Sequence, residues 1–290
     1  MNKIVYGFLA LFLSSLFSPS ISQAASLQRF QNISSLGTII YDEVPLSLQV
    51  FRARTSGKLT YQQRKNATTL TENLDMYIAW YYDGDTVKKI HDIRPDVKCL
   101  LYRNMRAIYS YTPEFQTALD KGWILKDSSG NLVRSTIWQV NYMADIGNKE
   151  YWDFIVEWLN NYFDQYGFDG VFADNCLKIS IYSAWWGCTA YPVNPRTGQL
   201  YTSDEVLNDQ VSFLNYVKER IGSKLWISNG IFRGVDFFAK THDRYIRLLT
   251  ETSIDGFMSE GIFNSGSDTG TGGSFYSEDK WKKSVDFVVW

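Results

Sequence analysis

Two seven-residue segments, far apart in the chain, share a pattern that ends in an acid. Residues 168–174 read Phe-Asp-Gly-Val-Phe-Ala-Asp, and residues 254–260 read Ile-Asp-Gly-Phe-Met-Ser-Glu. Side chains alternate along a β-strand, so the glycine, the middle apolar residue and the final acid of each segment share one face. Two parallel strands of this kind would bring the carboxylates of Asp174 and Glu260 to the same edge of a sheet.

A pair of carboxylates facing one pocket can cleave a glycosidic bond. One attacks or stabilises the anomeric carbon, and the other gives a proton to the leaving oxygen. A single acid at the end of a buried strand more often caps a helix or pairs with an arginine, but the matched pattern favours catalysis. Asp169 and Asp255, which precede the two glycines, are expected at the opposite edge of the sheet as turn or stability residues.

Further residues at predicted strand ends and in loops are candidates for binding a sugar. The polar candidates, which would bind hydroxyl groups or orient a carboxylate, are Asn175, Asn229, Arg52 and Arg103. The alternative for the two arginines is a structural ion pair, which uses the same type of residue. The aromatic candidates, whose rings would stack on a sugar, are Trp80, Tyr81, Trp138, Trp185 and Trp186. Core packing is the commoner use of any single aromatic residue, but the two tryptophans that follow Asp174 favour a substrate-facing loop.

Short apolar runs alternate with longer amphipathic stretches, which is typical of β/α units around a parallel sheet. The predicted strands are 48–52, 76–80, 98–103, 170–174, 225–229 and 256–260. We therefore expect a (β/α)8 TIM-type barrel with the two acids at its C-terminal rim. Six strands are found where a closed barrel needs eight, so we expect a barrel truncated after about six β/α units. The alternative is an open α/β sheet.

Helical signals lie between these strands. Apolar residues at spacings of three and four predict a helix over 149–166, with Asp145 or Asn148 as its N-cap and Gly167 after its end. A second helix is predicted over 203–221, before Gly222. The turn residues at 127–131 predict a small hairpin over the barrel mouth.

The N-terminus predicts export. Residues 1–24 combine a positive start, an apolar run and small residues before Ala24, as in a signal peptide, and leave 25–290 as the barrel domain. An uncleaved N-terminal anchor is the alternative. We expect a secreted or extracytoplasmic protein that does not stay in the membrane after cleavage, because no second long apolar stretch follows. The net charge of −2 and the absence of a basic stripe argue against nucleic-acid partners.

Three cysteines and two histidines bear on cofactors and crosslinks. Cys176 and Cys188 flank one loop, so they form a disulfide or remain thiols with about equal support from the sequence. Cys99 lies in an apolar run and is expected to be a buried thiol. No CxxC pair is present, so neither a metal nor another cofactor is expected.

The segment 168–175 resembles the fourth strand of barrel glycosidases related to the α-galactosidase, α-glucosidase and α-amylase group. This resemblance implies that Asp174, at the end of that strand, is the nucleophile. In the α-galactosidase branch the acid/base ends the sixth strand, which implies Glu260. That branch usually has aspartate there, and glutamate departs from its pattern.

The chain over 40–290 also resembles hypothetical glycosyl hydrolase family 15. The shared features are the stretch 145–148 (Asp-Ile-Gly-Asn) before a Tyr/Trp-rich helix, and the strand that reads Asp-Gly-Val-Phe-Ala-Asp-Asn. The family implies glycoside hydrolysis but no settled substrate.

Together these patterns predict a glycosidase that acts on a poly- or oligosaccharide with retention of configuration. Retention predicts carboxyl groups about 5–5.5 Å apart, whereas about 6.5–9.5 Å indicates inversion. The alternative is a degenerate barrel that binds carbohydrate without cleaving it. Serine hydrolysis and phosphoryl transfer are disfavoured, because neither a GxSxG motif nor a glycine-rich phosphate loop is present.

Overall fold

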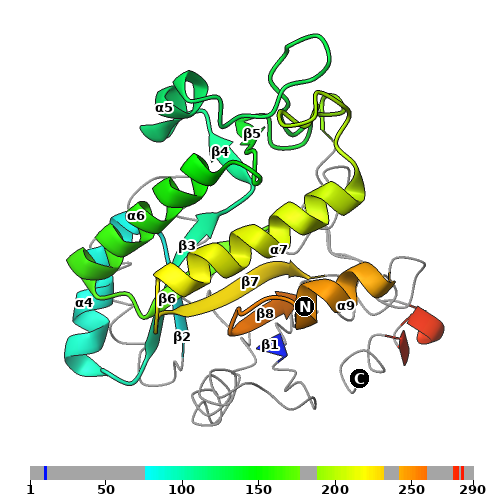
Figure 1. The fold of residues 1–290 in the computed structure, drawn as a ribbon. Coiled ribbons are helices and arrows are strands. Elements are labelled where there is room, and N and C mark those ends of the chain that lie inside the picture. Colours follow the sequence, from blue (N-terminus) through cyan, green and yellow to red (C-terminus); the bar gives the residue numbers. More distant parts are fainter. Residues whose placement is uncertain are drawn as a thin grey trace, which may run out of the picture.

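A computed structural model describes residues 10–11, 76–176, 188–231, 242–259, 277–280 and 282–283. Its main sheet has six strands in the order β1-β8-β7-β6-β3-β2 (Figure 1). Five of them run parallel: β2 (Met76–Ala79), β3 (Lys98–Asn104), β6 (Gly170–Asp174), β7 (Leu225–Ile231) and β8 (Gly256–Ser259). The two-residue β1 (Ala10–Leu11) pairs with β8 in the antiparallel direction. The five parallel strands match predicted ones, and the predicted strand 48–52 lies outside the described residues.

The helices between these strands form one layer. They are α4 (Gly84–Ile93), α6 (Lys149–Tyr166), α7 (Ser203–Arg220) and α9 (His242–Thr250), and a 3₁₀ turn, η2 (Tyr81–Asp83), precedes the first. Consecutive helices pack against each other, so the helices cover one face of the sheet in chain order (Figure 1). The parallel strands also follow chain order. This arrangement matches the wall of a (β/α) barrel and differs from a doubly wound sheet, which has helices on both faces. Closure into a barrel lies beyond what the described residues show.

The long helix α6 has the predicted bounds and ends. The side chain of Asn148 accepts a hydrogen bond from the backbone N–H of Glu150, which caps the N-terminus, and Gly167 adopts the left-handed conformation (φ 76°) after the last turn. Four residues of α6 are buried against the sheet: Tyr151, Ile155, Leu159 and Phe163. The second predicted helix is also confirmed, because α7 begins with a capping box between Thr202 and Glu205.

Strand register decides which side chains face the helices. Phe172 lies opposite Tyr102 of β3 and Ile227 of β7, so these three share the face turned away from the helices. The alternate residues point the other way: Trp226 of β7, for example, packs on Phe213 of α7 with ring centroids 6.3 Å apart. We refer to these as the inner and the helix-covered face. The final residue of β6, Asp174, belongs to the inner face.

A second layer of chain lies beyond the end of β3 (Figure 1). Between β3 and α6 the chain forms β4 (Ala107–Tyr109), α5 (Glu114–Asp120) and β5 (Asn141–Met143), and β4 pairs with β5 in the antiparallel direction. The predicted hairpin is confirmed by the bridge between Lys126 and Leu132. The chain that follows β6 returns at Cys188, which bridges to Ser135. We call the segments 107–145 and 188–202 the rim layer.

A second, smaller hydrophobic core, the rim core, joins part of the rim layer to Ile146 and to Val206 of α7, whereas other rim-layer residues such as Tyr109 and Trp123 belong to the main core. Its buried members are Ala107, Leu125, Val133, Met143, Ile146, Tyr201 and Val206. Arg196 ties the layer to the rest, because its guanidinium pairs with Asp145, 3.2 Å away, and with Asp209 of α7, 2.5 Å away. A membrane-spanning helix is not found among the described residues.

Candidate active site

The carboxylate of Asp174 lies at the carboxyl end of β6 and is held from both neighbouring strands. The hydroxyl of Tyr102, on β3, donates a hydrogen bond to Oδ2 at 2.5 Å. Nδ2 of Asn229, on β7, donates to Oδ1 at 2.8 Å. Both oxygens of the predicted nucleophile therefore accept a hydrogen bond, and three adjacent strands fix its orientation.

Tyr102 is the residue of this site that the sequence reasoning does not identify. Its ring stacks on Trp80, with centroids 4.6 Å apart, and lies 6.2 Å from the ring of Phe172. This packing leaves Tyr102 only 2% exposed and directs its hydroxyl to Asp174. Alternation along the strands is the sequence signal that could have identified it. Tyr102 lies opposite Phe172, and Phe172 precedes Asp174 by two residues, so all three side chains share one face.

Asn229 lies beside Asp174, although β7 continues two residues beyond the strand end that the sequence predicts, to Ile231. Its amide donates to the carboxylate itself, and contact with a sugar hydroxyl stays a prediction. Asn175 is 9% exposed and has a φ of 61°, a left-handed conformation that asparagine tolerates better than most residues. It turns the backbone directly after the carboxylate and offers little surface to a sugar.

Arg103, a predicted substrate-binding residue, does not share the face of Asp174. As the neighbour of Tyr102, it points to the helix-covered face, where its guanidinium lies 4.2 Å from the ring centroid of Trp158 and 3.3 Å from a carboxylate oxygen of Glu114. Its side chain is 8% exposed. Arginine at a strand end is thus used here for a buried structural ion pair.

The prediction that Trp80 is a stacking platform for a sugar is also not supported. Trp80 follows β2 and is only 5% exposed, because its ring packs between Tyr102 and Tyr82. It supports the tyrosine that holds Asp174. Tyr81 and Trp138 are half-buried and pack against the main core and the rim core respectively.

Four predicted site residues lie outside the described residues: Glu260, Arg52, Trp185 and Trp186. Glu260 follows β8 directly in the sequence. Met258 of β8 pairs with Asn229, so the last described inner-face residue of β8 is adjacent to the site.

Cys176 and Cys188 are not joined by a disulfide in the structure, so of the two alternatives left open by the sequence the thiols are observed. They belong to different cores, because Cys176 is buried in the main core and Cys188 packs against the rim core. Burial, together with the charge of Asp174, raises the pKa of the Cys176 thiol well above its ordinary value. Cys99 is the buried thiol that the sequence predicts, and burial raises its pKa to about 12.

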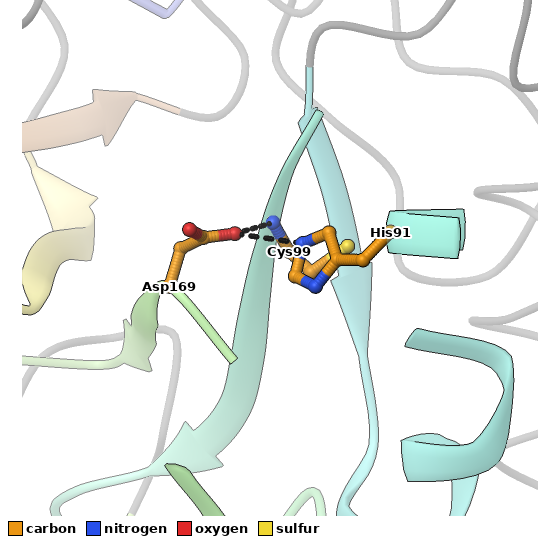
Figure 2. A group of neighbouring side chains, drawn as sticks. All are labelled: His91, Cys99 and Asp169. Atoms are coloured by element: carbon orange, nitrogen blue, oxygen red, sulfur yellow. Dashed lines mark hydrogen bonds and ion pairs between the residues drawn. The ribbon is translucent and has the colours of Figure 1, made fainter. Parts of the chain in front are cut away.

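At the opposite ends of the strands, Asp169 lies beside His91 and Cys99 (Figure 2). Its Oδ2 accepts hydrogen bonds from the backbone N–H of Cys99 at 2.9 Å and from Nε2 of His91 at 3.0 Å. A histidine, a thiol and a carboxylate are metal ligands by type. Here Nε2 also lies 3.2 Å from the carbonyl oxygen of Val97, and the thiol has a raised pKa, so the donors fit a hydrogen-bonded cluster better than a metal centre.

Asp255, which precedes β8, makes a similar contact. It accepts a hydrogen bond from the backbone N–H of Trp226 at 2.8 Å and pairs with Lys218 at 2.7 Å. Each aspartate thus binds the start of the neighbouring strand, Asp169 that of β3 and Asp255 that of β7, so both lie at the opposite ends of the strands from Asp174.

A family model and several solved structures are similar to the chain. The family model described as hypothetical glycosyl hydrolase family 15 matches residues 91–284. The glycoside hydrolase domain of PelA from Pseudomonas aeruginosa has a similar fold, with a TM-score of 0.51 at 11% identity over 77% of this chain and 75% of that domain. No curated protein sequence matches the chain.

A second solved structure is an α-galactosidase from Thermus thermophilus in complex with p-nitrophenyl α-D-galactopyranoside. It has a TM-score of 0.41 and 13% identity over 58% of this chain. The chain spans 34% of the length of that α-galactosidase. At these identities the likeness concerns the fold alone.

Proposed function

The chain belongs to hypothetical glycosyl hydrolase family 15 and is therefore a carbohydrate-active protein, and we propose that it hydrolyses O-glycosidic bonds of a poly- or oligosaccharide with Asp174 as the nucleophile. The observation that carries the proposal is the carboxylate of Asp174, held through both oxygens at the carboxyl end of β6. Barrel enzymes hold their reacting groups at this end of the strands.

The partners of Asp174 suit a carboxylate that acts as a nucleophile. An ionised carboxylate only accepts hydrogen bonds, and the Tyr102 hydroxyl and the Asn229 amide both donate to it. Neither partner carries a charge that would neutralise the carboxylate. Tyr102 and Asn229 are therefore positioning residues that aim Asp174 before the sugar binds, which lowers the cost of reaching the reactive geometry.

The proposed reaction proceeds in two displacements with overall retention. Asp174 attacks the anomeric carbon as the glycosidic C–O bond breaks, and a second acid gives its proton to the leaving oxygen, which forms a glycosyl ester on Asp174. Water then attacks the same carbon as that second group takes its proton, so the ester bond breaks and Asp174 is released. Glu260 is the proposed acid/base, because it ends the matching heptapeptide and follows β8, which pairs with the strand of Asn229.

Export completes the proposal. Residues 1–24 are proposed to be removed as a signal peptide, so that the protein meets its carbohydrate outside the cytoplasm. The N-terminal sequence of the protein recovered from the culture medium or periplasm tests this, and a chain that still begins at Met1 would contradict it.

The function is tested with Asp174→Asn in the full chain, against polysaccharides with reducing-end detection. We expect turnover to fall by more than about a thousandfold, as for other catalytic nucleophiles. The matched control is Asp164→Asn on the exposed side of α6, which should keep full activity. Turnover in Asp174→Asn equal to wild type would overturn the proposal, and NMR of the first-formed anomer distinguishes retention from inversion.

A further inference from the structure

Tyr111 is a solvent-exposed aromatic residue with a rigid support. It is 62% exposed, yet its ring lies on the ring of Tyr109 with an interplanar angle of 7° and centroids 5.4 Å apart. Tyr109, the last residue of β4, is only 7% exposed. A large apolar ring is thus held against a buried one and still presents most of its surface to water.

The turn that carries Tyr111 is fixed by hydrogen bonds at both ends. The backbone N–H of Thr112 donates to the carbonyl oxygen of Tyr109 at 3.0 Å, and the Thr112 hydroxyl donates to the same oxygen at 2.7 Å. The backbone N–H of Ser110 donates to the carbonyl oxygen of Val140 at 2.9 Å, which ties the turn to the residue before β5. A ring fixed in this way loses little conformational entropy when a flat ligand packs on it.

A series of ring contacts connects Tyr111 to the proposed nucleophile. The ring centroid of Tyr109, beneath it, lies 6.4 Å from that of Trp80. Trp80 in turn stacks on Tyr102, whose hydroxyl donates a hydrogen bond to Asp174. Tyr111 therefore belongs to the same rim of the sheet as Asp174, at the carboxyl ends of β2 and β3. Val140, 42% exposed, adds apolar surface next to this turn.

From this placement we propose that Tyr111 is a stacking platform for a pyranose ring, at a subsite that binds the carbohydrate away from the bond being cleaved. The C–H face of a pyranose is apolar and slightly positive, which complements the negative face of an aromatic ring. The inference rests on the proposed function, because Asp174 supplies the direction in which the sugar chain extends. It names the class of ligand as a carbohydrate long enough to reach from Asp174 to Tyr111.

The test measures binding by calorimetry with the full chain carrying Asp174→Asn, so that no probe is cleaved. The probes are maltoheptaose, cellohexaose and chitohexaose. Adding Tyr111→Ala should weaken binding of the probe that binds best about tenfold, which corresponds to about 1.4 kcal/mol. Tyr111→Phe keeps the ring and should stay within about twofold. Tyr191→Ala, an equally exposed tyrosine in the other segment of the rim layer, is the control and should also stay within about twofold.

The outcomes separate this inference from the proposed function. Unchanged affinity in Tyr111→Ala, an equal loss in Tyr191→Ala, or no binding of any probe would overturn the Tyr111 site. Binding that depends on Tyr111 together with wild-type turnover in the Asp174→Asn protein would support the site and overturn the role of Asp174. Loss of turnover in Asp174→Asn with affinity independent of Tyr111 would support the role of Asp174 and overturn the Tyr111 site.

Discussion

Replacing Tyr102 with phenylalanine removes one hydroxyl group and leaves the ring in place. The ring contacts with Trp80 and Phe172 are kept, so the packing of the inner face should survive. The loss is the 2.5 Å hydrogen bond to Oδ2 of Asp174, which leaves Asn229 as the remaining described side-chain donor to that carboxylate.

The size of the effect follows from the charge on the acceptor. A hydrogen bond to a charged group is worth about 1.5–3 kcal/mol, which corresponds to about a ten- to hundredfold fall in kcat if it is needed to aim the nucleophile. KM should stay within about twofold, because the hydroxyl binds Asp174 and is not assigned a contact with substrate. The free energy of unfolding should fall by about 1 kcal/mol or less, since Asp174 is partly exposed and water replaces the donor.

The assay is steady-state hydrolysis of the polysaccharide that wild type cleaves, with urea unfolding measured on the same samples. Tyr142→Phe is the matched control, because its ring packs on Phe115 in the rim layer. A double-mutant cycle with Asn229→Ala should be non-additive, because both residues hold the same carboxylate. A kcat for Tyr102→Phe within twofold of wild type would refute the reasoning, and so would a rise in KM with kcat unchanged.

Three further predictions address residues outside the catalytic pair. Arg103→Met should lower the free energy of unfolding by about 3 kcal/mol, because it leaves Glu114 unpaired in a mostly buried site; kcat of the folded protein should not change, and a selective loss of kcat would restore a role in catalysis. Gly170→Ala should cost about 1–3 kcal/mol in urea unfolding, because a Cβ there would lie 2.2 Å from the carbonyl oxygen of Leu225; wild-type stability would contradict that close approach. Cys99 should resist iodoacetamide at pH 8 in the native protein, because its pKa of about 12 keeps the thiol protonated at pH 8. Rapid labelling seen by mass spectrometry would show that the thiol is not buried.

The sequence alone predicts the elements whose signal is local. Alternation and the matched heptapeptides place Asp174 at the end of β6, and a capping asparagine with a closing glycine sets both ends of α6. Asp169 and Asp255 are also predicted correctly, since an acid before the strand must lie at the opposite edge from an acid at its end.

The failures arise where the answer depends on pairing between distant strands. Arg103 and Tyr102 are neighbours on β3, and only the register with β6 tells which of them shares a face with Asp174. The positive charge of Arg103 suggests a site residue, whereas the residue that binds Asp174 is its neutral neighbour Tyr102. Of the rim layer, the sequence predicts only the hairpin. β4 and β5 have three residues each, too few for a clear pattern, and the bridge from Ser135 to Cys188 joins segments far apart in sequence.

The rim core has a consequence for how such a protein can diversify. Its buried members, among them Leu125, Val133 and Tyr201, form a cluster apart from the main core, to which Tyr102, Trp80 and also Tyr109 belong. Insertions or substitutions beside this smaller core, in 125–140 and 188–202, can therefore reshape what surrounds a bound glycan while the support of Asp174 stays intact. Relatives with different sugar preferences are expected to differ mainly in these two stretches and to keep the tyrosine, the asparagine and the aspartate that meet across β3, β6 and β7.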